Sequence, residues 1–431
     1  MPKFEKIVQY VLITLELFNK HGLANHAAAG AYGFLFSAAP ALLIVSFFVT
    51  ETLESSPETS AALIGQMGLL GSVFDMRQLT VTFLGASKPG MGGLISIAGL
   101  LWTARVFTLS LQRGLGVIFP DTDKIHPVKK ALVSAGIQGA LILFTFIAVL
   151  TSEAAFLMYH VIGVVSTHRL IRLFAGFIPL IVLGMFIFGV YMLVPALPPK
   201  RKAAFQGAIF CLVCNILILE GSRFMFNPAK YNIIYGTLGN LFILLADVYF
   251  FFIIFFWGAE LTFVIHYFDA LIISRFIKNH SEIAPNKSRF ERRFFMSTAG
   301  RLKTYLRTYP KGNAVFHKGD KTGEVYYILS GEAEVYLEET VMLTLIKPGN
   351  FFGEMGHLLA EGRSATIKAR EELQVLVMPP DLFHEVLKNN TEADQKVIEI
   401  LSQRLKDVNE KLIAAKRAVL SDSKTAEEGE P

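Results

Sequence analysis

The segment from Phe351 to Thr366, FFGEMGHLLAEGRSAT, contains the residues best suited to chemistry. Gly353 predicts a turn into a short helix, whose N-terminal N–H groups favour an anion. Arg363 supplies a planar guanidinium that can bind two phosphate oxygens, and Glu354 supplies an acceptor for a ribose hydroxyl. Together these residues indicate a site for a sugar-linked cyclic phosphate.

The elements that must position this segment are short strands separated by glycines. From about Leu306, glycines divide runs such as VYYILSGEAEVYL and VMLTLI, a spacing that predicts a small antiparallel β-barrel or jelly roll. Residues 391 to 416 then predict an amphipathic helix, because apolar side chains recur in four-three-four spacing. Such a helix is also suited to a short coiled coil, which would make the protein a homo-oligomer.

From about Leu306 to Leu412 the chain resembles the cyclic-nucleotide-binding domain. The resemblance rests on Phe316-x-x-Gly319-Asp320, Tyr327-x-Ile-x-x-Gly331, Gly349-x-Phe-Phe-Gly353-Glu354 and Arg363-Ser364-Ala365. It implies a regulatory ligand, cAMP or cGMP, whose phosphate binds Arg363 and whose ribose 2′-hydroxyl binds Glu354. It further implies backbone or hydroxyl contacts from Gly353, Ser364 and Ala365, and a last helix that closes over the base. The alternative is a degenerate domain that keeps the barrel and binds nothing.

The composition of the rest of the chain differs sharply. Of 431 residues, 52% are hydrophobic and 18% charged, against roughly 45 to 50% and about 25% in soluble domains. Residues 1 to 274 hold only 30 of the 77 charged residues, whereas residues 275 to 431 hold 47. This predicts a membrane-embedded part followed by a water-soluble part, and it argues against an ordinary cytosolic enzyme.

Six apolar runs are long enough to cross a bilayer as helices, which takes about 20 residues each. They are residues 27 to 50, 92 to 117, 131 to 156, 171 to 197, 203 to 226 and 237 to 267. Residues 4 to 20 predict a helix lying on the inner leaflet, because their apolar side chains share one face. Ten Lys and Arg residues flank the spans on one side and six on the other, which predicts that both termini are cytoplasmic.

Ionisable residues inside spans are expensive, and three of them are functional candidates: Arg105, Glu260 and Asp247. Arg105 and Glu260 fall at similar depth in the inner half of the membrane, where they could pair. The alternative is that such residues form structural ion pairs or lie near interfacial water. Asp247 has no charged neighbour within a turn, and we expect it to respond to a proton or to the substrate.

The first part of the chain resembles the YihY/BrkB family of bacterial inner-membrane proteins over most of residues 20 to 270. The matching stretches are AAAGAYGFLFSAAPA from Ala27, LLWTARVFTLSLQRGL from Leu100, LPPKRKAAFQGAI from Leu197 and YNIIYGTLGNLFILLADVYFFFIIFFWGAEL from Tyr231. Asp247 departs from the family, which usually has an aromatic or apolar residue there. The resemblance implies an exporter or a participant in envelope lipid traffic. An older ribonuclease label for the family is rejected here, because the ten histidines are scattered singly and form no metal-ligand cluster.

The sequence therefore predicts a six-helix membrane domain (1–270), a basic linker (271–300), a cyclic-nucleotide-binding domain (301–416) and a disordered tail (417–431). The leading hypothesis is an exporter or lipid-handling transporter, without enzymatic activity or a metal, that is regulated by cyclic nucleotide. A non-transporting receptor or scaffold is the alternative. A nucleotide-gated channel is less favoured, because no carbonyl selectivity filter is recognisable. No nucleic-acid partner is expected, because an acidic tail stands where related regulators have a helix-turn-helix.

Overall fold

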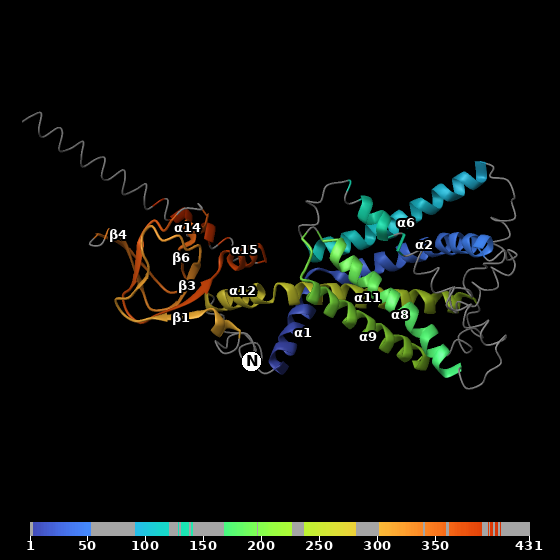
Figure 1. The fold of residues 1–431 in the computed structure, drawn as a ribbon, viewed down its shortest axis with the longest axis horizontal. Coiled ribbons are helices and arrows are strands. Elements are labelled where there is room, and N and C mark those ends of the chain that lie inside the picture. Colours follow the sequence, from blue (N-terminus) through green and yellow to red (C-terminus); the bar gives the residue numbers. More distant parts are fainter. Residues whose placement is uncertain are drawn as a thin grey trace, which may run out of the picture. The chain divides into compact units, whose positions relative to one another are not determined.

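The computed structural model describes residues 3–52, 91–119, 168–195, 197–225, 237–281, 301–338, 341–358 and 362–389, with shorter stretches within 128–140 and 395–406. The chain forms two compact units. We call Tyr10–His266 the helical unit, and Tyr267–Pro431 together with Met1–Gln9 the sheet unit. Figure 1 shows the elements of each.

Long helices build the helical unit. They are α1 (Lys3–Lys20, which begins in the sheet unit), α2 (Leu23–Thr52), α6 (Met91–Ile118), α8 (His168–Leu193), α9 (Arg201–Met225) and α11 (Thr237–His266). Helix α11 contacts α2, α6, α8 and α9, and so forms the centre of the unit. Helices cover five of the six predicted spans. The span 131–156 is helical over 131–137, and most of the rest of it lies outside the described residues.

Glycines on α2 allow phenylalanines of two other helices to approach closely. The rings of Phe34, Phe107 and Phe252, one each from α2, α6 and α11, have centroids 5.9 to 6.3 Å apart. A Cβ at Gly33 would lie 2.9 Å from the Phe107 Cα, and one at Gly30 would lie 3.1 Å from the Phe252 ring. The small residues of AAAGAYG are therefore required by packing.

Helices α9 and α11 approach each other at backbone distance. A Cβ at Gly207 would lie 2.5 Å from the Gly258 carbonyl oxygen, and one at Gly258 would lie 2.9 Å from the Gly207 oxygen. The Tyr191 hydroxyl of α8 donates a hydrogen bond to the Phe255 carbonyl at 2.6 Å, next to this crossing. The contact is of the small-residue type that lets membrane helices pack tightly.

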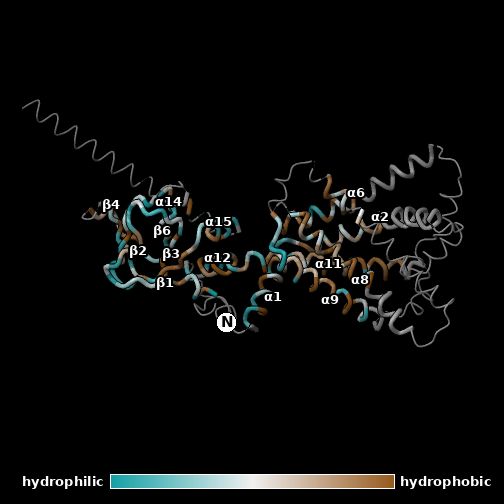
Figure 2. The backbone as a smooth tube through the Cα atoms, viewed as in Figure 1, coloured by the Kyte–Doolittle hydropathy of each residue, from teal (hydrophilic) through white to brown (hydrophobic). Residues whose placement is uncertain are grey.

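Large apolar side chains also lie exposed on the outside of these helices. The hydropathy colouring in Figure 2 shows that α8, α9 and α11 are rich in hydrophobic residues. Met185, Leu217 and Phe242, one on each helix, are 69%, 66% and 63% exposed. By length and composition, Arg201–Ile218 of α9 and Leu241–His266 of α11 could each cross a membrane. Exposed apolar faces of this size indicate contact with lipid or a partner.

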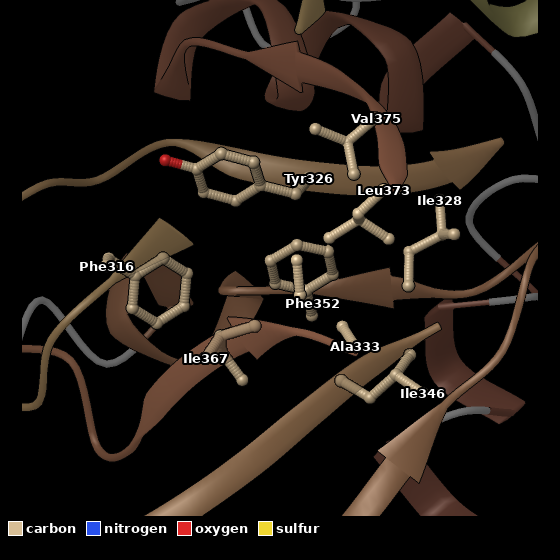
Figure 3. Close-up of a cluster of buried hydrophobic side chains, with 10 residues drawn as sticks. Phe316, Tyr326, Ile328, Ala333, Ile346, Phe352, Ile367, Leu373 and Val375 are labelled. Atoms are coloured by element: carbon tan, nitrogen blue, oxygen red, sulfur yellow. The ribbon is translucent and has the colours of Figure 1, made fainter. Parts of the chain in front are cut away.

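Two antiparallel four-stranded sheets form the core of the sheet unit. Their strands are β1 (Leu306–Tyr309), β2 (Ala314–Phe316), β3 (Val325–Ser330), β4 (Ala333–Glu338), β5 (Val341–Ile346), β6 (Phe351–Phe352), β7 (Thr366–Ala369) and β8 (Leu373–Met378). The strand orders are β1-β8-β3-β6 and β2-β7-β4-β5. Apolar residues of both sheets face one another in Figure 3, where Tyr326 stacks on Phe352 with ring centroids 4.9 Å apart. This architecture agrees with the predicted jelly roll.

Three further helices flank the sheets: α12 (Phe268–Ser281), α14 (Glu354–Leu358) and α15 (Pro380–Asn389). The predicted basic linker, in which short helices were expected, begins with α12: residues 271–281 belong to this helix, and most of them are buried rather than polar and exposed. The charged residues of RFIKNH make this segment look polar in the sequence. Apolar residues nevertheless recur there at helical spacing, namely Ile272, Ile273, Phe276 and Ile277. Residues 282–300 and the predicted tail 417–431 lie outside the described residues.

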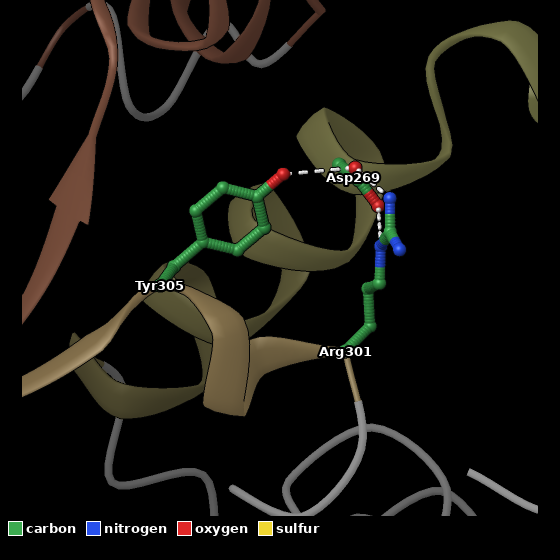
Figure 4. A network of polar contacts seen from close by, with 3 residues as sticks. All are labelled: Asp269, Arg301 and Tyr305. Atoms are coloured by element: carbon green, nitrogen blue, oxygen red, sulfur yellow. Dashed lines mark hydrogen bonds and ion pairs between the residues drawn. The ribbon is translucent and has the colours of Figure 1, made fainter.

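A carboxylate near the start of α12 joins this helix to the entry of β1 (Figure 4). Asp269 accepts hydrogen bonds from Arg301 Nε at 2.7 Å, from Arg301 Nη2 at 2.9 Å and from the Tyr305 hydroxyl at 2.9 Å. Burial, followed by the hydrogen bond to Asp269, raises the pKa of Tyr305 to about 12. Tyr305 therefore remains a protonated donor at neutral pH.

The Tyr305 pKa predicts a loss of stability in alkali. Folding raises the pKa of Tyr305 from 10.0 to about 12. The contribution of Tyr305 to the free energy of unfolding is therefore complete below pH 10 and is lost as the pH rises through 12. We expect the difference in thermal stability between wild type and Tyr305→Phe to be constant from pH 7 to 9 and to shrink above pH 10. A difference that stays constant to pH 12 would contradict the assignment.

Candidate functional site

Arg363 lies at the centre of the predicted site, and its guanidinium is almost completely enclosed. The residue is 3% exposed. Its Nη1 donates to the Gly353 carbonyl at 2.6 Å, its Nη2 to the Glu324 carbonyl at 2.7 Å and its Nε to Thr322 Oγ1 at 3.1 Å. At least three of the five N–H bonds of the guanidinium are therefore used within the protein.

Aromatic rings and a glycine shape the space around the guanidinium. Arg363 Cζ lies 4.2 Å from the centroid of the Phe316 ring and 5.7 Å from that of Tyr326, which suits cation–π contacts. Gly353 has φ +79°, and a Cβ there would lie 2.7 Å from Arg363 Nη1. Glycine is therefore required at 353 both by the backbone and by the arginine.

The structure brings Glu354 and Arg363 into one cluster. Glu354 opens α14, is 1% exposed, and directly follows Gly353, whose carbonyl accepts a hydrogen bond from Arg363. Burial lowers the pKa of Arg363, while Tyr326, Glu324, Asp320 and Glu354 act in the opposite direction. An arginine keeps its charge in such a site, so the site contains a buried cation and, at the residue after Gly353, a buried carboxyl group.

Ser364 and Ala365 follow Arg363 directly in the chain. The Ser364 side chain is exposed, and Ala365 is half-buried. Among the described residues, none forms a side-chain hydrogen bond with Ser364. The expected contact between the Ser364 hydroxyl and a ligand therefore stays a prediction.

Sequence reasoning missed the residues that hold Arg363 in place. Glu324 acts through its backbone carbonyl, which carries no side-chain signature, and Gly353 was expected to contact the ligand rather than to accept a hydrogen bond from Arg363. Thr322 lies 41 residues before Arg363, in a loop that strand patterns do not position. Phe316 did carry a signal, because it begins the first quoted motif, but only the fold reveals that its ring packs on the guanidinium.

The predicted pairing of Arg105 with Glu260 in the helical unit is wrong. Glu260 is fully buried on α11, and its Oε2 lies 3.0 Å from Nδ1 of His21, in the turn between α1 and α2. Arg105 is exposed. It lies two residues, or about 200° of helical rotation, from Phe107, whose ring faces α11. Depth alone could not reveal on which side of α6 the arginine lies.

Asp247 is half-buried on α11, well away along the helix from Glu260. Among the residues that the structure describes, none forms a hydrogen bond or an ion pair with its carboxylate. Its role in the helical unit remains the prediction made from the sequence.

The His21–Glu260 contact predicts a modest effect of an isosteric change. Glu260→Gln retains a hydrogen-bonding partner for His21 but removes the charge, so we expect a loss of about 1 kcal/mol in the free energy of unfolding. Thermal unfolding of the purified full chain in detergent would measure it. Glu220→Gln on the exposed face of α9 is the control and should be close to wild type. Equal stabilities for the two variants would contradict the prediction.

The residues of the site fit a cyclic nucleotide. Arg363 is a buried cation of the kind that pairs with a phosphate, Glu354 is a buried carboxyl group that can accept a hydrogen bond from a hydroxyl, and Gly353 has no side chain that would displace the arginine. The jelly roll, the short helix α14 and this cluster together define a cyclic nucleotide-binding domain. A family model with that description, "Cyclic nucleotide-binding domain", matches residues 306–390.

A second family model, described as "Virulence factor BrkB", matches residues 14–272, which is more than half of the chain. The chain belongs to the BrkB family, a membrane family, and carries a cyclic nucleotide-binding domain after the BrkB domain.

Curated relatives resemble the second domain. The "cAMP-activated global transcriptional regulator CRP" of Pasteurella multocida (strain Pm70) is 28% identical over 111 residues, which is 24% of this chain and 53% of that protein. The "Cyclic AMP receptor protein" of Thermus thermophilus is 29% identical over 108 residues, 24% of this chain and 50% of that protein. The chain thus spans about half the length of the curated relatives it matches. Among solved structures, the Thermus thermophilus catabolite activator protein is 25% identical with a TM-score of 0.24, covering 26% of this chain and 54% of that one.

Proposed function

We propose that this chain is a bacterial inner-membrane protein whose helical unit exports a solute or handles envelope lipid, and that cyclic nucleotide bound by the sheet unit regulates it. The observation that supports this proposal most strongly is that Arg363 and Glu354 are both buried at Gly353, on the same chain as a BrkB-family domain. A ligand controls such a protein only if it binds two conformations with unequal affinity. The proposal assigns no catalytic step to the chain.

The exposed side chains support a location in the bilayer. Besides the apolar outer faces of α8, α9 and α11, helix α1 exposes Ile7, Val11 and Leu15, which are spaced four residues apart on one face. This stripe suits an interfacial helix. We propose six spans with both termini in the cytoplasm.

Topology can be tested in cells. A reporter fused after Pro431 should be active in the cytoplasm, and cysteines introduced at residues 55 to 65 should react with an impermeant reagent from outside. Labelling of those cysteines only after lysis would overturn the orientation.

Calorimetry on the full chain in detergent would test the ligand. We expect heat of binding with cAMP or with cGMP, and the names of the curated relatives favour cAMP. If a folded full chain binds neither nucleotide, the domain is degenerate and the regulatory proposal fails.

Reconstitution into liposomes would separate the remaining functions. Candidate solutes and fluorescent lipids would be followed with and without nucleotide, in wild type and in Asp247→Asn. Movement of a solute or lipid that nucleotide alters would support the transporter. Ion flux alone would indicate a channel, and binding without any movement would indicate a receptor or scaffold.

A further inference from the structure

Helix α12 is joined directly to the central helix of the helical unit. Helix α11 ends at His266 and α12 begins at Phe268, so the backbone of Tyr267 alone connects them. Helix α12 nevertheless belongs to the compact unit that contains the two sheets. The covalent connection between the two units at this point is therefore a single residue of backbone.

Polar contacts fix α12 at both of its ends. Near its start, Asp269 accepts the three hydrogen bonds from Arg301 and Tyr305 (Figure 4). Near its end, Nδ1 of His280 lies 3.3 Å from the Tyr327 hydroxyl, and the two rings meet edge to face with centroids 5.8 Å apart. Between these points, α12 packs against α15. These contacts hold α12 against β3 and against the entry of β1.

The strands under α12 also line the nucleotide site. On β3 and β6, Tyr326 and Phe352 stack inside the barrel beside Arg363. Their neighbours Tyr327 and Phe351 point to the opposite face, because successive strand residues alternate. There Tyr327 meets His280 of α12, and Phe351 meets Phe383 of α15 at 6.0 Å.

Arg363 ties together the ends of these two strands. Its guanidinium holds the carbonyl of Glu324, directly before β3, and the carbonyl of Gly353, directly after β6. Because at least three of the five guanidinium N–H bonds are already used, a cyclic phosphate that takes two of them must displace a present acceptor or use the remaining bonds beside these carbonyls. The positions of β3 and β6, and of the helices on their outer faces, therefore depend on whether Arg363 binds carbonyls or phosphate.

From this arrangement we propose that α12 transmits nucleotide binding to α11, and that the cluster of Asp269, Arg301 and Tyr305 is the positioning contact that makes transmission possible. The proposal rests on the regulatory function proposed above. The hydrogen bonds of this cluster join α12 to the entry of β1, whereas those of Arg363 run to Thr322, Glu324 and Gly353, so we expect that transmission can be removed without removing binding.

The test is hydrogen exchange of the full chain in lipid nanodiscs, followed by mass spectrometry, with saturating cAMP or cGMP. In wild type, nucleotide should change exchange at the end of α11, residues 255 to 266, by at least about fivefold. Arg301→Gln and the milder Tyr305→Phe should bind nucleotide within about twofold of wild type. Both should lose the change in α11.

A matched control is available in the same unit. Arg370 pairs with Glu332 at 2.8 Å and is 52% exposed, whereas Arg301 pairs with Asp269 at 2.7 Å and is 51% exposed. Arg370→Gln removes a comparable ion pair away from α12 and should keep both binding and the response of α11.

Four outcomes would overturn the proposal, and one of them also overturns the proposed function. If wild type binds nucleotide but α11 does not respond, or if Arg301→Gln and Tyr305→Phe still respond, α12 does not transmit and the binding function stands. If Arg301→Gln and Tyr305→Phe fold but no longer bind nucleotide, the cluster serves the site itself. If folded wild type binds neither nucleotide, the regulatory function fails together with the proposal.

Discussion

Arg363→Gln is expected to abolish nucleotide binding at physiological nucleotide concentrations. The substitution removes the buried cation that faces the phosphate, which should weaken binding by at least about 2 kcal/mol, or roughly 30-fold. Arg363→Lys should fall between glutamine and wild type, because an ammonium keeps the charge but not the planar fork. Calorimetric titration of the full chain with cAMP and cGMP measures the effect.

The same substitution should also lower the stability of the sheet unit. The Gly353 and Glu324 carbonyls lose their guanidinium donors, and the Phe316 ring loses its stacked partner. Arg370→Gln is the control, because Arg370 is exposed and should affect neither property appreciably. If Arg363→Gln bound nucleotide as tightly as wild type, the guanidinium could not be the phosphate ligand.

The second large effect is expected at the crossing of α9 and α11. Gly207→Leu places a side chain against the Gly258 carbonyl oxygen, already 2.5 Å from an added Cβ, and against Thr262 Oγ1. Neither helix backbone can retreat without opening the packed interface. We expect the helical unit to lose at least about 3 kcal/mol in stability or to fail to fold.

Trp257 provides a probe of this crossing, because its ring lies 5.8 Å from that of Phe210, one turn beyond Gly207 on α9. Unfolding in detergent can therefore be followed by tryptophan fluorescence. Gly221→Leu on the same helix is the control, since nothing lies within 4 Å of a Cβ there. Comparable stability of the two leucine variants would show that the close approach is not required.

The sequence predicted those features that depend on local pattern. Glycines and alternating apolar residues indicated the strands from Leu306 onward, and the run of fixed spacings around Arg363 and Glu354 indicated the site. Both follow from short-range rules of periodicity and turn chemistry.

The features that the sequence could not predict depend on the direction in which a side chain points or on backbone atoms. The partners of Arg363 are mostly carbonyls. Glu260 finds His21 rather than Arg105, because helix rotation and not depth decides which side chains meet. Helix α12 was assigned to a polar linker with short helices because charged residues interrupt its apolar positions, and only packing shows that those positions are buried.

The separation between His21 and Glu260 has a consequence for biosynthesis. The two residues are 239 positions apart, so at about 5 to 20 residues per second a ribosome makes Glu260 roughly 10 to 50 s after His21. Helices α2 and α6 are synthesised early, but α11, which fills the space between them and α9, is synthesised last. Until it arrives, Gly30 of α2 and Gly207 of α9 lack the α11 residues against which they pack. The helices that are inserted first must therefore leave room for α11 until it has been synthesised.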